Sequence, residues 1–128
     1  MKIIMIVDDE RVLREAFAAY FSDRHWQPII KGSGEEGLQL LEKESPNAAL
    51  VDIRLPGMDG GEFIRRACQL KPQMAFVICT GSPEYHLPPD LQQNPQVSNH
   101  IFRKPVARLV DLENELTRMI QILEQNHE

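Results

Sequence analysis

Cysteine is scarce in this sequence and long hydrophobic runs are missing, which narrows the class of protein. The chain has only two cysteines, Cys68 and Cys79, spaced neither as a metal site nor as a redox pair. No apolar stretch approaches the roughly 20 residues of a membrane-spanning helix. Met1-Lys2 leads into a strand-like run rather than into a signal peptide. We therefore expect a cytoplasmic protein with reduced thiols and no membrane association.

Basic residues are also fewer than acidic residues. Lysine and arginine total 14 against 19 acidic residues, for a net charge of −5. The chain therefore lacks the basic character of a nucleic-acid binder, and we expect no direct nucleic-acid binding by this domain. The composition is otherwise that of a globular domain, with 42% hydrophobic residues. We expect one domain over residues 1–128, either free-standing or the N-terminal part of a longer protein.

Short apolar runs alternate with amphipathic segments along the chain. The predicted strands span residues 2–7, 26–31, 48–52, 74–79 and 97–103. The predicted helices span residues 9–23, 33–45, 60–70 and 106–125, and the prolines between 82 and 96 limit any helix there to about 90–93. Pro28 places its strand at a sheet edge, and Ser33 with Glu36 forms a capping-box pattern. This alternation predicts an α/β fold with a parallel sheet covered on both faces.

Polar residues follow the predicted strands at the points where they end. Asp8 and Asp9 follow the first strand, Asp52 ends the third, Thr80 follows the fourth and Lys104 follows the fifth. The carboxyl ends of parallel strands lie at one edge of the sheet, where ligands bind in open α/β folds. The pattern thus predicts three carboxylates, a hydroxyl and an ammonium group in one place.

This combination of groups suits phosphoryl transfer. Three carboxylates repel one another, and one lysine cannot balance them, whereas a Mg²⁺ ion would. An aspartate can act as a nucleophile and form an aspartyl-phosphate. The transfer mainly requires positioning and charge neutralisation at the phosphoryl oxygens, which Mg²⁺, an ammonium and a hydroxyl group supply.

The motifs, taken together and in order, resemble the receiver domain of two-component response regulators. The resemblance covers essentially the whole chain and rests on Asp8-Asp9, Asp52, Leu55-Pro56-Gly57-Met58-Asp59-Gly60, Thr80-Gly81 and Lys104-Pro105. It implies a flavodoxin-like, doubly wound five-stranded parallel sheet of strand order 2-1-3-4-5, with helices on both faces.

The resemblance also implies a role for each acidic residue. Asp52 is expected to be the phosphoacceptor, taking its phosphoryl group from a sensor histidine kinase or a phosphotransfer protein. Asp8, Asp9 and Asp52, with the backbone carbonyl of Arg54, are expected to hold Mg²⁺. The chain would then be a signalling switch with self-phosphorylation and autodephosphorylation activity only, and not an enzyme that acts on an external substrate.

Further expectations from the resemblance concern Thr80 and Lys104. Thr80 is expected to bond a phosphoryl oxygen, and Lys104 to pair with the phosphoryl group. The Lys104–Pro105 peptide bond is expected to be cis. The output partner or effector domain is not identified by the sequence, and a phosphorylation-dependent dimer is compatible with it.

Three features depart from the usual family pattern. Ile101 stands three residues before Lys104, where the family often has an aromatic residue, and Phe102 should point to the opposite side of the strand. The proline-rich stretch 82–96 lies where the fourth helix and part of the usual signalling surface belong. Arg54 carries a cationic side chain that we expect to reach the phosphoryl group and shield it from water.

Two other functions fit the sequence less well than a receiver domain. An aspartate-nucleophile phosphatase normally has a second carboxylate two residues after the nucleophile, where this chain has Arg54. An inactive receiver-like interaction module is disfavoured by the complete acidic set and by Lys104.

Overall fold

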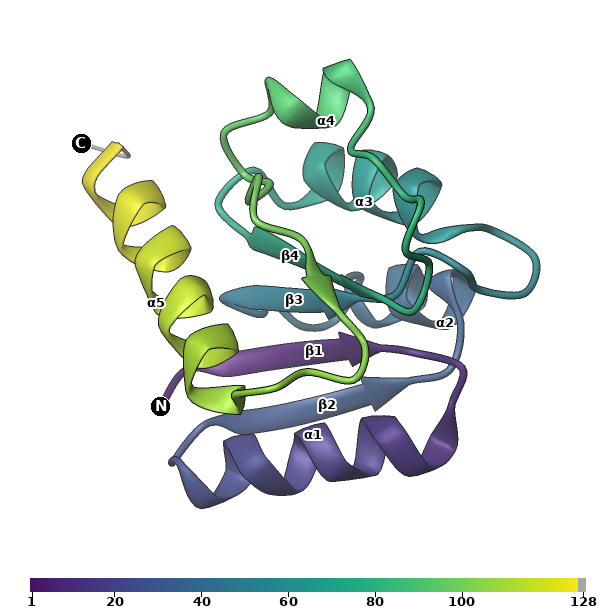
Figure 1. Ribbon diagram of the computed structural model, residues 1–128. Helices are drawn as coiled ribbons and strands as arrows, with labels where there is room; N and C mark the ends of the chain where they lie inside the picture. Colours follow the sequence, from purple (N-terminus) through teal and green to yellow (C-terminus); the bar gives the residue numbers. More distant parts are fainter. Residues whose placement is uncertain (127–128) are drawn as a thin grey trace.

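The computed structural model describes residues 1–126, in which five parallel strands form a single sheet (Figure 1). The strands are β1 Ile3–Val7, β2 Gln27–Lys31, β3 Ala48–Val51, β4 Ala75–Thr80 and β5 Phe102–Arg103. Their order in the sheet is β2-β1-β3-β4-β5, and every neighbouring pair is parallel. The predicted doubly wound fold and strand order are therefore confirmed, and the strand that contains Pro28 is an edge strand as expected.

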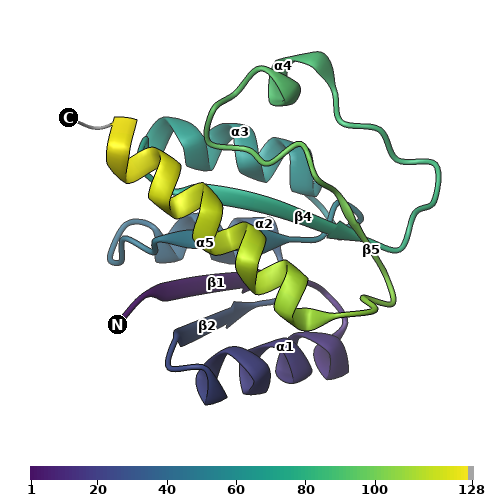
Figure 2. The same cartoon turned by 60° about the vertical axis from the view of Figure 1, so that its left-hand side comes forward.

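Helices cover both faces of this sheet (Figures 1 and 2). Helices α1 Arg11–Asp23 and α5 Leu109–Asn126 lie on one face, and α2 Gly34–Leu40, α3 Gly60–Leu70 and the short α4 Pro89–Gln92 lie on the other. Among residues 1–126, no helix combines the length and the apolar character that crossing a bilayer requires.

Alternate side chains of each central strand enter the two cores, which fixes the positions of the strands. Ile4 and Ile6 of β1 pack under α1 and α5, whereas Met5 and Val7 pack under α2, α3 and α4. All of these side chains are fully buried. A one-residue slip of a strand would exchange its two faces, so the residue that follows each strand is also held in place.

The last strand is shorter than the sequence predicts. Only Phe102–Arg103 forms β5, and Val97 contributes a single isolated bridge to Phe76. Between them the Ser98 hydroxyl accepts a hydrogen bond from the backbone N–H of His100, 3.0 Å away, and this local bond turns the chain out of the sheet. Ile101 packs in the α3 and α4 layer and Phe102 in the opposite layer, which confirms the predicted alternation.

Three helix boundaries also differ from the predicted ones. Helix α1 begins at Arg11 rather than at residue 9, because the Asp8 carboxylate accepts the Glu10 N–H at 2.9 Å and holds the preceding residues in a turn. Helix α2 ends at Leu40 and passes into a tight turn through residue 43. Helix α5 begins at Leu109 instead of residue 106. The short helix α4 lies within one residue of its expected position.

Helix α3 begins directly against the backbone that follows β3. The N–H of Gly60 donates to the carbonyl oxygen of Ile53 at 2.9 Å, and a Cβ atom on Gly60 would lie only 2.2 Å from the carbonyl oxygen of Asp52. The Asp59 side chain caps the helix by accepting the Glu62 N–H at 2.9 Å. A glycine is therefore required where the helix meets the end of β3.

We predict that Gly60→Ala destabilises the protein by about 2–3 kcal/mol, because the added methyl group displaces the backbone at Asp52 or the start of α3. The matched control is Gly61→Ala in the same helical turn, where the new Cβ would meet only side-chain atoms at 3.4 Å. That control should leave stability unchanged or raise it by up to about 1 kcal/mol. Urea denaturation of both variants measures the difference, and equal stabilities would contradict the prediction.

Candidate functional site

Asp8 and Asp52 lie side by side at the carboxyl edge of the sheet. Val7 pairs with Val51 across β1 and β3, and the two aspartates are the next residue of each strand. The N–H of Asp52 donates to the carbonyl oxygen of Val7 at 2.9 Å, and the N–H of Asp8 donates to the carbonyl oxygen of Lys31 at 3.1 Å. The sheet thus extends by one backbone bond beyond each strand and places both carboxylates at the same level.

Three carboxylates gather at this edge. One oxygen from each of Asp8, Asp9 and Asp52 lies within 4.8 Å of the others. Asp8 and Asp52 are 3% and 5% exposed, whereas Asp9 is exposed to solvent. Carboxylate oxygens are the ligands that Mg²⁺ prefers, and the exposed side of the cluster leaves room for the waters that this ion retains. The cluster therefore fits a receiver-domain Mg²⁺ site.

Lys104 faces the same cluster from the end of β5. Its Nζ atom lies 2.8 Å from Asp8 Oδ2, 3.1 Å from Asp52 Oδ2 and 3.4 Å from Glu10 Oε1. Burial alone would lower the pKa of Lys104, but the hydrogen bonds and charges of Asp8 and Asp52 hold it well above its ordinary value. The lysine is therefore a permanent cation at this edge. Its peptide bond to Pro105 is cis, as predicted.

The Asp52 carboxylate uses its two oxygens differently. Oδ2 accepts from Lys104, and Oδ1 accepts from the backbone N–H of Arg54 at 3.3 Å. Burial nevertheless raises the pKa of Asp52, and the charge of Asp8 adds to this effect against the opposing influence of Lys104 and the Arg54 N–H. Lys104 thus leaves the negative charge at Asp52 incompletely compensated.

Thr80 is fully buried at the end of β4, beside the strand that leads to Lys104. Its carbonyl oxygen accepts the Lys104 N–H at 2.9 Å, and its hydroxyl oxygen accepts the N–H of Ser82 at 3.2 Å. The guanidinium group of Arg54 donates through Nη2 to the hydroxyl oxygen of Ser82 at 3.2 Å. The Arg54 side chain therefore spans from the end of β3 to the loop that follows β4.

Ser82 and Arg103 belong to this edge although neither was singled out from the sequence. Arg103 donates through Nη1 to the carbonyl of Ser82 at 2.6 Å and through Nη2 to the carbonyl of Tyr85 at 2.8 Å. Two sequence signals point to them. Ser82 stands two residues after Thr80, just as Arg54 stands two residues after Asp52. Arg103 directly precedes Lys104, so in an extended chain its side chain points away from that of Lys104, and here it reaches the loop after β4.

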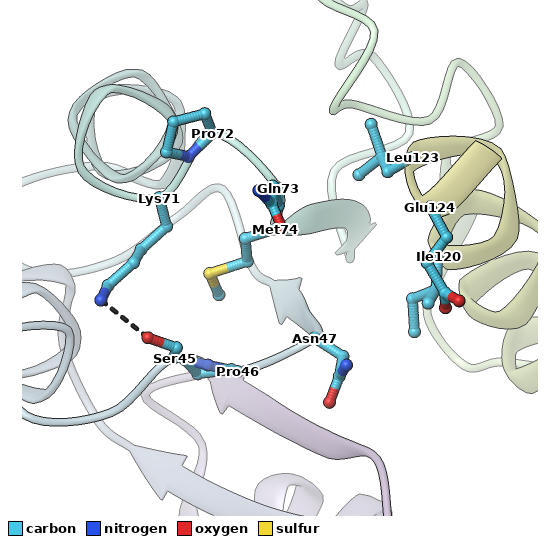
Figure 3. A pocket seen from close by; sticks show the side chains of 10 residues that line it. All are labelled: Ser45, Pro46, Asn47, Lys71, Pro72, Gln73, Met74, Ile120, Leu123 and Glu124. Atoms are coloured by element: carbon cyan, nitrogen blue, oxygen red, sulfur yellow. Dashed lines mark hydrogen bonds between the residues drawn. The ribbon is translucent and has the colours of Figure 1, made fainter. Parts of the chain in front are cut away.

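A separate pocket of about 370 Å³ lies at the opposite end of the sheet, where β3 and β4 begin (Figure 3). It lies between the loops that precede these strands and the last turns of α5, and includes Met74, Ile120 and Leu123. Lys71 Nζ donates to the Ser45 hydroxyl at 2.9 Å on its rim. The residues that line it include none of the predicted site residues, so this pocket is not part of the carboxylate site.

Known proteins similar to this chain include bacterial regulatory proteins and a response regulator receiver protein. The chain is 34% identical over 87 residues to the positive alginate biosynthesis regulatory protein of Pseudomonas aeruginosa, a match that covers 66% of this chain and 35% of that protein. It is 28% identical over 120 residues to the response regulator receiver protein CpdR of Brucella abortus, covering 94% of this chain and 98% of that one. The chain spans between 23% and 65% of the length of the first curated relatives that it matches.

The comparison with solved structures agrees with the sequence relatives. The CheY-like response regulator receiver domain protein of Methanospirillum hungatei superposes with a TM-score of 0.83 at 27% identity, covering 98% of each chain. The family model described as the response regulator receiver domain matches residues 4–107, which include the carboxylate cluster and Lys104. The chain therefore belongs to the response regulator receiver domain family of two-component systems.

Proposed function

We propose that the chain is a phosphorylation-dependent switch in which Asp52 accepts a phosphoryl group from a sensor histidine kinase or a phosphotransfer protein. The family as a whole consists of signalling switches that interact with such proteins. The observation that carries the proposal is the position of Asp52 Oδ2, 3.1 Å from the ammonium group of Lys104 and within the cluster of Asp8 and Asp9.

The transfer itself needs little covalent chemistry from the protein. A carboxylate oxygen of Asp52 attacks the phosphorus atom, the bond from phosphorus to the donor breaks, and the donor leaves with the electron pair. Lys104 balances charge on the phosphoryl oxygens. The Thr80 hydroxyl accepts its bond from Ser82, which leaves its own proton to donate to a phosphoryl oxygen.

The acidic cluster would supply the metal for this step. The carboxylates of Asp8, Asp9 and Asp52 and the backbone carbonyl of Arg54 would hold Mg²⁺, which neutralises charge that builds up during transfer. The buried carboxylates favour such an ion because Lys104 is shared between them and cannot balance both.

The direct test is intact-mass analysis after incubation with acetyl phosphate, with Mg²⁺ or with EDTA. We expect a single phosphoryl adduct that requires Mg²⁺ and is absent from Asp52→Asn. Asp59→Asn is the matched control, because Asp59 lies in the turn after Asp52, caps α3, and keeps a side-chain oxygen as asparagine. An adduct that forms without Mg²⁺, or that persists in Asp52→Asn, would overturn the proposal.

Asp52→Asn should also stabilise the unmodified protein at pH 7. The pKa of Asp52 is raised in the folded state, so folding binds protons and the wild-type free energy of unfolding falls as pH rises from the ordinary aspartate value through the raised one. Asparagine carries no charge, so the gain should be present at pH 7 and disappear below about pH 4.

Chemical denaturation of the two proteins across this pH range measures that gain. Added Mg²⁺ should narrow the difference at pH 7, because it binds the folded wild type more tightly than the variant. Equal stabilities at pH 7 would show that the charge of Asp52 is already compensated.

Arg54 is proposed to protect the phosphoryl group from water. Its guanidinium group is held at Ser82, on the Thr80 side of the site, and can turn toward an anion on Asp52. We predict that Arg54→Ala shortens the lifetime of the Asp52 phosphoryl adduct severalfold, as followed by intact mass after removal of the donor. Arg66→Ala, which removes an arginine paired with Glu62 on the exposed side of α3, is the control. An unchanged lifetime in Arg54→Ala would contradict this role.

A further inference from the structure

Ser82 links the phosphoacceptor edge to the loop that follows β4. Its hydroxyl accepts from Arg54 and its backbone N–H donates to Thr80, both at 3.2 Å. Its carbonyl accepts from Arg103, whose second Nη atom donates to the carbonyl of Tyr85. Ser82 is 8% exposed, so water competes little with these bonds. One buried residue is therefore bonded both to two groups beside Asp52 and, through Arg103, to the backbone at Tyr85.

Tyr85 is held in an unfavourable position for its hydroxyl group. The ring packs with Ile101 against the core under α3 and α4, and burial raises the pKa of Tyr85. Within residues 1–126 the buried hydroxyl oxygen of Tyr85 has no hydrogen-bond partner. A buried hydroxyl without a partner costs free energy that exposure to water or a new partner would recover.

Space for another position of the ring adjoins its present one. Tyr85 and Ile101 line an open pocket of about 350 Å³ together with Leu87, Asn99 and Arg103. Isoleucine at position 101 leaves this space without the ring that an aromatic residue would place there. The Tyr85 side chain therefore borders a hollow that is open to solvent.

The chain from Leu87 onward is held in place by contacts that do not involve Ser82. Arg65 on α3 makes two hydrogen bonds to the Asp90 carboxylate, of 2.7 and 3.1 Å, and Leu87 and Leu91 are buried in the core. The segment free to respond to Ser82 is consequently short, from Ser82 to about His86.

We propose that Ser82 is a positioning residue that couples the phosphorylation state of Asp52 to the position of Tyr85, an inference that rests on the proposed function. A phosphoryl group on Asp52 is a stronger acceptor than the Ser82 hydroxyl for Arg54, and it also attracts the Thr80 hydroxyl. The bonds of Ser82 to Arg54 and to Thr80 are then lost or weakened, while Arg103 keeps its hydrogen bonds to the carbonyl oxygens of Ser82 and Tyr85. The loop shifts, and the Tyr85 hydroxyl moves into the adjoining pocket, where water or a partner protein can bond it.

The test follows Tyr85 directly by ¹⁹F NMR of the full chain labelled with 3-fluorotyrosine. The sequence has two tyrosines, and Tyr20→Phe assigns the two resonances. With acetyl phosphate and Mg²⁺, the Tyr85 resonance should shift in proportion to the phosphorylated fraction measured by intact mass. The Tyr20 resonance should stay in place, because the Tyr20 hydroxyl bonds Glu113 on the other face of the sheet.

Three serine variants then test whether the shift of the Tyr85 resonance depends on the Ser82 hydroxyl and not on the loss of any serine hydroxyl. In Ser82→Ala the shift per phosphorylated molecule should fall at least twofold, and Ser82→Thr, which keeps a hydroxyl, should restore it. Ser45→Ala is the matched control, since it removes the same kind of bond, from Lys71, at the opposite end of the sheet (Figure 3).

Each outcome decides between the two proposals. A phosphorylated wild-type chain with an unmoved Tyr85 resonance, or an undiminished shift in Ser82→Ala, would overturn the coupling and leave the proposed function standing. Absence of a phosphoryl adduct in the wild type would overturn the proposed function, and this inference with it.

Discussion

Lys104 lies between two buried carboxylates, so one positive charge faces two negative charges at the carboxyl edge of the sheet. The chemistry of this edge depends on that imbalance. A buried carboxylate is costly unless it is paired, yet one ammonium group here serves both Asp8 and Asp52. Asp9 adds a third negative charge at the solvent side of the cluster. The edge thus carries more negative charge than Lys104 balances, and the acidic cluster fits a receiver-domain Mg²⁺ site.

The sheet produces this arrangement because its strands are buried on both faces. Alternate side chains of β1, β3 and β4 enter opposite cores, so the strands cannot slip, and the pairing of Val7 with Val51 sets the two aspartates side by side. The close approach of Gly60 to the carbonyl of Asp52 fixes the other side of the turn. The site is therefore assembled by packing that lies almost wholly outside it.

The loop after β4 is where the molecule departs most from regular strand and helix alternation. Prolines restrict α4 to Pro89–Gln92, and two guanidinium groups, those of Arg54 and Arg103, converge on Ser82 instead. Ile101 leaves space beside Tyr85. In this chain, which has no aromatic residue at position 101, these polar contacts join the carboxylate edge to the loop that leads to α4.

The sequence alone determined the elements and the strand-end residues, whereas the tertiary structure decided the contacts among them. Apolar periodicity is a local property, so the alternation of strands with helices, the edge position of Pro28 and the short helix near residue 90 could be predicted. The strand order and the cis bond at Pro105 came from family resemblance. The short β5, the start of α1 at Arg11, and the bonds of Ser82 with Arg54 and Arg103 could not. The short β5 and the start of α1 follow from local bonds of the Ser98 and Asp8 side chains to nearby backbone N–H groups, which apolar periodicity does not report. The bonds of Ser82 join residues that are distant in sequence and meet only when the sheet forms, so they leave no periodic pattern in the chain.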